Sequence, residues 1–252
     1  MYELTLVNGI ALLLAGVVAG FINTIAGGGS MLTLPALMLL GMPADIANAT
    51  NRVGVMFQSI TGLKGFHKEK KLDTGAMVSI VVPTLIGSAV GAVLASWLPV
   101  DVLKPVLLGS MVAIALVMVM KPSTMRPTGE HVRTITSHPQ AAIGLFLAGV
   151  YGGFLQAGVG FMLLAALAGS LRYDLVRANA LKILCTGAFT AVALGIFIWN
   201  DLILWVPGLI LALGSSVGAH FSVKFAVTAS QKTLSWILFV MVLLASGAAW
   251  FS

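Results

Sequence analysis

The sequence predicts an all-α polytopic membrane protein with about eight transmembrane helices in two homologous four-helix repeats. Of its 252 residues, 59% are hydrophobic and 9% are charged, and the mean hydropathy is +1.04. Soluble domains carry about 25% charged residues, so a soluble core does not explain this composition. Apolar runs that approach or exceed the roughly 20 residues needed to cross a bilayer occupy 78–98, 102–120, 141–155 and 236–251.

The first repeat, 1–120, is expected to contain four spans. Its first span covers about 4–25 and is followed by a glycine-rich break and a short apolar piece over 31–40. Asp45 and Asp101 are residues of the type that caps helix N-termini, and each precedes an apolar run. The expected spans after the break are therefore 46–66, 74–97 and 102–120.

A polar segment over 121–140 predicts a linker, and the second repeat, 141–252, follows the pattern of the first. The hexapeptide that starts at Gly149 echoes the one that starts at Gly16, at a separation of 133 (149 − 16). Likewise, 214–219 matches 87–92 at a separation of 127 (214 − 87). Several matches in the same order indicate an internal duplication.

The spans of the second repeat are expected at 141–171, which contains a second break, and at 175–199, 202–225 and 234–251. Asp174, which matches Asp45, is expected to cap the span that follows it. Four crossings per half predict two halves of the same orientation, as in parallel repeats. A short broken piece that merely re-enters would change this parity.

The glycine break of the first repeat is the strongest indication of a functional site. Three glycines, Gly27, Gly28 and Gly29, interrupt a segment that is otherwise apolar enough to span a bilayer. Each costs a helix about 1 kcal/mol relative to alanine. In lipid, broken backbone persists only where it is packed in protein or lines a wet cavity, and broken helices mark transporter binding sites. The other interpretation is that the glycines allow tight helix crossing.

These motifs resemble the TauE/SafE (sulfite exporter) family. Its first-half signature is similar to Gly20-Phe21, the segment 26–30, Leu34-Pro35, Gly41 and the segment 47–51. Its second-half pattern is similar to 149–160 and 214–219, so the resemblance covers nearly the whole chain. The resemblance implies a permease for small sulfur-containing anions, such as sulfite, sulfoacetate or other organosulfonates.

An anion in a low-dielectric interior needs backbone donors or cations around it. A helix that begins at Ser30 would present free N–H groups and the positive end of its dipole. At the two breaks, side-chain or backbone donors are offered by Asn23, Thr24, Gln156, Gly158 and Gly160. The alternative for the polar side chains among these is local capping of the backbone.

Arg52 lies about two turns into an apolar span, where a charge costs at least about 2.5 kcal/mol and is usually functional. Asn48 and Asn51 share its side of the helix. The matching helix of the second repeat carries Asn179 and Lys182, and Lys182 is a candidate second cation. The alternatives are that Arg52 reaches the membrane interface and that Lys182 belongs to an interfacial basic cluster.

His220, just after the repeated glycine motif, is the one imidazole in a position to carry a proton. The alternative is a packed histidine with a hydrogen-bonded neighbour. The remaining cations, which give a net charge of +6, are mostly in loops, where they act as topology signals rather than as a nucleic-acid site. In the eight-span arrangement the loops 67–71 and 121–133 share one side, and this bias predicts cytoplasmic termini.

The sequence therefore predicts a multi-pass protein of the cytoplasmic (inner) membrane. We expect a secondary transporter or facilitator that binds a small sulfur-containing anion between the two broken helices. An anion channel is the first alternative, and a membrane enzyme or assembly factor for sulfur compounds is a weaker one. No nucleophile with its base, metal cluster or cofactor motif is recognisable, so no enzymatic activity, cofactor or metal is expected. The sequence leaves open whether copies associate as a homo-oligomer.

Overall fold

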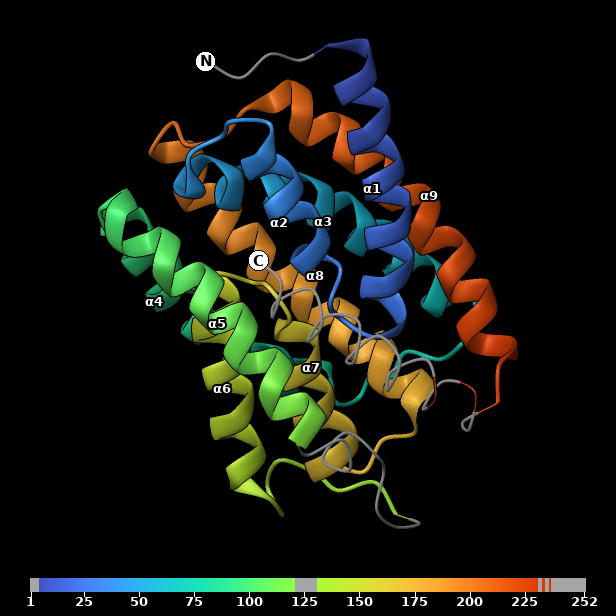
Figure 1. The fold of residues 1–252 in the computed structure, drawn as a ribbon. Coiled ribbons are helices and arrows are strands. Elements are labelled where there is room, and N and C mark those ends of the chain that lie inside the picture. Colours follow the sequence, from blue (N-terminus) through green and yellow to red (C-terminus); the bar gives the residue numbers. More distant parts are fainter. Residues whose placement is uncertain (1–4, 121–130, 231–232, 234–235, 237–252) are drawn as a thin grey trace.

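The computed structural model describes residues 5–120, 131–230, 233 and 236, and every regular element in these ranges is helical (Figure 1). The elements of the first half are α1 (Leu6–Ile25), α2 (Ser30–Leu39), α3 (Ala44–Lys68), α4 (Met77–Trp97) and α5 (Val100–Met120). Those of the second half are α6 (Pro139–Phe154), α7 (Val159–Leu164), the π-helix η2 (Ala165–Ser170), α8 (Leu175–Trp199) and α9 (Trp205–Thr228). Most of the expected last span and of the linker lies outside the described residues.

Four of these helices, α1, α4, α8 and α9, are long and apolar enough to cross a membrane. The chain is thus a polytopic membrane protein. The predicted second span is also a helix, α3, but its polar side chains keep it out of this group. These side chains are buried in protein rather than directed to lipid: Asn48, Thr50, Asn51, Arg52, Gln58 and Ser59. Helix α3 packs against α8 and α9, and α8 in turn packs against α4.

The capping predictions have different outcomes in the two repeats. Asp174 is the N-cap of α8, and its carboxylate accepts hydrogen bonds from the backbone N–H groups of Val176 and Arg177. Asp45, in contrast, lies inside the first turn of α3, because the helix already begins at Ala44 with Pro43 as its N-cap. A carboxylate in the first turn still favours the helix through its dipole.

Contacts at glycines show that α1, α3 and α9 run in the same direction. Along α1, Gly9 lies beside Ile210 and Gly20 lies beside Ser215 of α9. Along α3, Gly54 approaches Leu211 and Gly65 approaches Val223 of the same helix. In each pair the residue numbers rise together, so the helices are parallel.

The helices α4, α6 and α8 run in the opposite direction. Gly149 and Gly153 of α6 lie against Thr84 and Ser88 of α4, so α4 and α6 are parallel. Along α8 and α3 the order is reversed, because Ile183 lies at Gly62 whereas Gly187 lies at Ser59. The hydrogen bond from Ser88 to the carbonyl oxygen of Phe189 then joins α4 to α8 farther along both helices.

Helix α2 turns back along α1 instead of crossing to the other end. Gly29 lies against Ala19 of α1, whereas Leu37 shares a cluster with Leu12 and with Ala47 of α3. Consequently α1 and α3 begin at the same end of the molecule. The two halves are inverted relative to each other, and the parallel arrangement expected from four crossings per half is wrong. The glycine break is the physical reason, because it lets the chain reverse inside the bundle.

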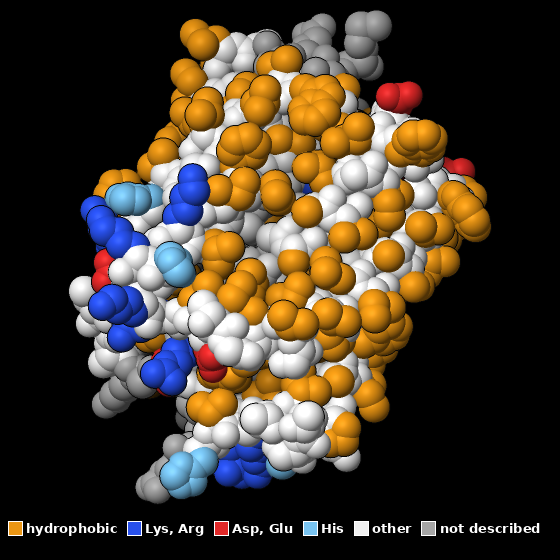
Figure 2. Space-filling model, turned by 180° about the vertical axis from the view of Figure 1, so that it is seen from behind, with side chains coloured by type: hydrophobic (Ala, Val, Ile, Leu, Met, Phe, Trp, Pro, Cys, Tyr) orange, Lys and Arg blue, Asp and Glu red, His pale blue; other side chains and the backbone are white. Residues whose placement is uncertain are grey.

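One end of the molecule collects most of the charged side chains. The last turns of α3 and α9 and the first turns of α4, α6 and α8 lie at this end, which we call the basic end. Its described cations are Lys64, Lys68, Lys70, Lys71, Arg133, Arg172, Arg177 and Lys224. Figure 2 shows Lys and Arg side chains gathered along the left side and at the bottom of the view, while apolar side chains cover most of the rest of the visible face. Helix α1 begins at the opposite end.

Candidate functional site

The two glycine breaks meet inside the bundle. The backbone of Gly27, just after α1, lies so close to that of Gly160 in α7 that neither position has room for a Cβ atom. Gly27 also has a φ of 96°, a left-handed conformation that L side chains rarely adopt. The two residues are 133 positions apart (160 − 27), as are Gly16 and Gly149. The predicted internal duplication makes Gly27 and Gly160 equivalent positions, and the structure places them against each other.

The other glycines of the breaks also serve close packing. Gly28 lies against the ring of Phe161, and Gly29 lies against the backbone of α1. Gly158, with a φ of 75°, is the N-cap of α7. Outside the breaks, Gly16 and Gly20 allow α1 to cross α9 tightly. The packing interpretation thus holds for these crossings.

Arg52 reaches from α3 to the end of α6. Its guanidinium donates to the carbonyl oxygen of Gly152 and, at 2.9 Å, to that of Gly153. Asn48, one turn earlier, donates at 2.8 Å to the carbonyl oxygen of Phe154, the last residue of α6. The last carbonyls of a helix lack intrahelical partners and carry the negative end of its dipole. Arg52 and Asn48 therefore cap the broken helix of the second repeat.

Lys182, in the second repeat, caps the broken helix of the first repeat. From α8, its ammonium group donates at 2.8 Å to the carbonyl oxygens of both Asn23 and Thr24 near the end of α1. A third hydrogen bond, of 2.7 Å, goes to Oδ1 of Asn179. Asn23 and Thr24 are the third-last and second-last residues of α1, as Gly152 and Gly153 are of α6. Each repeat thus supplies the cation that caps the broken helix of the other repeat.

Side-chain hydrogen bonds connect the breaks to the long polar helices. Asn23 donates to Oε1 of Gln58 at 2.9 Å, and Gln156 donates to Thr190 at 2.9 Å. Gln156 has a φ of 66°, which is uncommon outside glycine. Gln58 and Thr190 were not among the predicted site residues, although each lies on the same helix as a predicted cation, six and eight positions after it.

The start of α2 is attached to α3 by a second small network. Asn51 donates to the hydroxyl of Ser30 at 3.0 Å and accepts from the hydroxyl of Thr33 at 2.6 Å. The structure thus brings Ser30 and Asn51 together. Thr33 was missed because a hydroxyl one turn into an apolar helix gives little signal in the sequence.

His220 is not brought to the breaks. It is exposed on α9, where its imidazole contacts the ring of Phe221 edge-on. Two neighbours on α9 face α1: Gly218 packs on Val17, and Ser222 donates to the carbonyl oxygen of Phe21. A residue two positions away points to the opposite side of an α-helix. His220 therefore lies on the outer face of α9 and not between the breaks.

Arg52 and Lys182 are the buried charged side chains of the described interior. Arg52 is 0% exposed and Lys182 is 1% exposed. In the described part of the chain, the one ion pair is that of Arg177 with Asp174 at 3.6 Å, and it lies near the surface. Neither buried cation therefore has a described carboxylate partner. Three buried polar atoms near the breaks also lack a described hydrogen-bond partner: Nε of Arg52, Oε1 of Gln156 and Nδ2 of Asn179.

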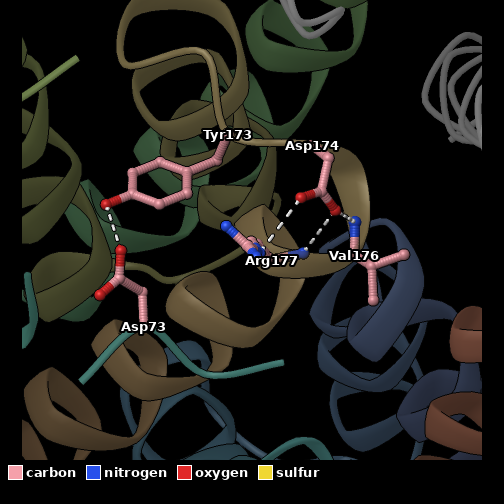
Figure 3. A network of polar contacts seen from close by, with 5 residues as sticks. All are labelled: Asp73, Tyr173, Asp174, Val176 and Arg177. Carbon is pink, nitrogen blue, oxygen red and sulfur yellow. Dashed lines mark hydrogen bonds and ion pairs between the residues drawn. The ribbon is translucent and has the colours of Figure 1, made fainter. Parts of the chain in front are cut away.

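A polar joint between the repeats lies at the basic end (Figure 3). The hydroxyl of Tyr173, before α8, donates at 3.0 Å to Oδ2 of Asp73, before α4. The other carboxylate oxygen of Asp73 accepts from the backbone N–H groups of Gly75 and Ala76. Tyr173 is 3% exposed, and burial, together with the neighbouring Asp73 carboxylate, raises the pKa of its hydroxyl. This joint connects the two halves outside the spans.

Comparison with known proteins gives a family for the chain. A family model described as sulfite exporter TauE/SafE matches residues 12–249. The "Probable membrane transporter protein ORF9" of Sinorhizobium sp is 29% identical over 231 residues, which cover 91% of this chain and 87% of that protein. The "Probable membrane transporter protein YfcA" of Escherichia coli (strain K12) is 28% identical over 223 residues, with coverages of 88% and 82%. No solved structure matches.

Proposed function

Because the chain belongs to the sulfite exporter TauE/SafE family, we propose that it is a secondary transporter or facilitator for small sulfur-containing anions. Sulfite and organosulfonates are the proposed substrates, and the cytoplasmic membrane is the proposed location. The names of the relatives, "Probable membrane transporter protein", support transport rather than an enzymatic activity. The substrate class rests on the description of the family.

The main support for an anionic substrate is the pair of buried cations that have no acidic partner among the residues the structure describes. Arg52 and Lys182 are both fully buried, and their described acceptors are helix-end carbonyls and asparagine side chains rather than carboxylates. The guanidinium carbon of Arg52 also lies 5.4 Å from the centre of the Phe197 ring. Removing a charge from water is expensive unless it is compensated. The ends of two helix dipoles supply only part of that compensation, about half a unit charge each. An anion between the breaks would supply the rest.

The proposed substrate site lies between the two breaks. Its first-repeat members are Asn23, Thr24, Gly27, Gly28, Gly29, Ser30, Asn48, Asn51 and Arg52. Its second-repeat members are Gln156, Gly158, Gly160, Asn179 and Lys182. Gly27 and Gly160 bring the two breaks into contact in this conformation. Inverted repeats suit alternating access, in which one half rocks against the other around such a site.

We also propose that the basic end faces the cytoplasm, since Lys and Arg are enriched in cytoplasmic loops. At the opposite end the described chain has one cation outside the interior, Lys104 at the start of α5, together with Asp101 and Asp201. Because α1 begins at that opposite end, the N-terminus would face away from the cytoplasm. This orientation differs from the cytoplasmic terminus expected for eight full crossings, because α2 re-enters.

The direct test is transport by purified protein in liposomes. Uptake of sulfite, sulfoacetate, isethionate and taurine would be compared with uptake of acetate and chloride over a range of concentrations. We expect saturable transport of at least one sulfur-containing anion, with the anion recovered unchanged. Transport that rises linearly with concentration would favour an anion channel. Chemical conversion of the anion would favour an enzyme, and no transport of any sulfur-containing anion would contradict the proposed substrate class.

A further inference from the structure

We propose that the two buried cations have different roles. Lys182 is a positioning residue that fastens the first break to the second repeat, whereas Arg52 uses its remaining N–H groups to contact the transported anion. This inference rests on the proposed function, because it assigns separate tasks within the same site. The two cations differ in how many N–H donors each has and in how many of these donors are already used.

The donors of Lys182 are all used. An ammonium group has three N–H bonds, and Nζ of Lys182 has three acceptors at 2.7 to 2.8 Å: the carbonyl oxygens of Asn23 and Thr24, and Oδ1 of Asn179. An anion that bound to Nζ would have to displace one of them. Two of the three belong to the end of α1, so displacement would release the helix that forms the first break.

The donors of Arg52 are only partly used. A guanidinium group has five N–H bonds in a fixed plane. Its two terminal nitrogens donate to Gly152, Gly153 and, at 3.5 Å, to Asn48. The Nε atom is buried and has no hydrogen-bond partner among the residues that the structure describes. Arg52 can therefore hold α6 through one edge of its guanidinium while it offers Nε–H to an oxyanion.

Lys182 affects the anion through its neighbours. Asn179 accepts from Lys182 through Oδ1, and its Nδ2 is buried without a described partner. The hydrogen bond from Lys182 holds the Oδ1 atom of Asn179, so the amide nitrogen Nδ2 remains available to donate to the anion. Removal of the ammonium group should accordingly loosen the break and disturb Asn179, but leave the cation that contacts the anion in place.

The test uses the full chain with Cys185, its single cysteine, replaced by serine, and with Ala26→Cys as a reporter. Ala26 follows α1 directly and is fully buried. Two quantities are measured on detergent-purified protein: the dissociation constant for sulfite or sulfoacetate by calorimetry, and the labelling rate of the reporter by a water-soluble maleimide without anion. The variants are Lys182→Met, Lys182→Arg and Arg52→Met, with Lys224→Met as a matched control on the exposed surface of α9.

We expect Lys182→Met to raise the labelling rate about tenfold or more, as loss of charge-assisted hydrogen bonds predicts. The dissociation constant, which changes only through the disturbed Asn179, should rise by less than about threefold, as for a weakened neutral hydrogen bond. Lys182→Arg should restore slow labelling, because a guanidinium group also donates to carbonyl oxygens. Arg52→Met should weaken anion binding by about tenfold or more, as for a lost hydrogen bond to a charged group. Lys224→Met should change neither quantity.

The inference is overturned if Lys182→Met weakens anion binding as much as Arg52→Met does and leaves labelling unchanged. If neither anion binds to the parent protein, the proposed function and the anion contact of Arg52 are both rejected. The labelling rates still decide the role of Lys182 in that case. Should Lys182→Met not fold, Lys182→Gln retains two N–H donors without the charge, and its labelling rate should lie above that of the parent protein.

Discussion

Tyr173 and Asp73 join the two repeats at the basic end through a single hydrogen bond of 3.0 Å between a buried phenol and a carboxylate. Tyr173 lies before α8, and Asp73 lies between α3 and α4. At the opposite end, Met42 lies before α3 and Leu204 lies before α9. These two residues pack in one apolar cluster, so this contact between the repeats is apolar. The two ends of the inverted structure are therefore closed by different chemistry.

Tyr173→Phe should remove this joint without leaving a cavity. A hydrogen bond to a charged group contributes about 1.5–3 kcal/mol, so the midpoint of thermal unfolding should fall by several degrees at pH 7. Burial raises the pKa of Tyr173 above its ordinary value of about 10. The unfolded phenol thus ionises first, and the advantage of the parent protein should be complete below pH 10 and shrink above it. Unfolding of both proteins between pH 7 and 11 measures this, and a constant difference would contradict it.

The proposed orientation predicts which loops are accessible from each side of the membrane. In a Cys185→Ser background, a cysteine at Glu69 should react with an impermeant maleimide only from the cytoplasmic side. A cysteine at Asn200 should react only from the outside, because both positions are exposed and lie at opposite ends. Labelling of intact cells and of inverted vesicles makes the comparison. The reverse pattern would place the basic end outside.

The sequence was sufficient to predict the helical membrane architecture, because composition and the lengths of apolar runs depend on the bilayer alone. It also predicted that breaks interrupt both repeats, since equivalent glycines recur 133 positions apart. The direction of the repeats was predicted wrongly. An apolar piece of ten residues, such as α2, has the same composition whether it completes a crossing or turns back, so the parity of the crossings cannot be counted from hydropathy.

The cations were found from the sequence, but their partners were not. Arg52 and Lys182 stand out because charges are rare within apolar spans. Their acceptors are backbone carbonyls of the other repeat, such as those of Gly153 and Thr24. Every residue has a carbonyl, so no side-chain pattern identifies these partners. The side of α9 on which His220 lies could not be predicted for a related reason, since the inward face of α9 is defined by small residues rather than by a polar stripe.

The exposed position of His220 predicts that it does not couple protons to transport. His220→Gln should leave both the rate of anion uptake and its dependence on pH unchanged between pH 5.5 and 8. The reason is that its imidazole is on the outer surface of α9, away from both breaks. Uptake into liposomes with and without a pH gradient provides the measurement. Loss of a gradient-driven component in the variant would restore His220 as the proton carrier.

The contact between the two breaks gives the most direct prediction about transport. Gly27→Ala should destabilise the protein by more than about 1 kcal/mol, because the left-handed φ disfavours a side chain and the new Cβ would overlap Gly160. Gly160→Ala should have a similar effect from the steric overlap alone. Either variant that still folds should be held with its breaks apart and lose transport.

Gly109 and Gly195 provide matched controls for these substitutions. Both are helical glycines, in α5 and α8, and a Cβ atom at either would meet nothing within 4 Å. Alanine there should leave transport unchanged and stabilise the helix by up to about 1 kcal/mol, because alanine is the better helix former. Thermal unfolding and liposome uptake of all four variants make the comparison. If Gly27→Ala and Gly160→Ala behaved like the controls, the close approach of the breaks would have no part in transport.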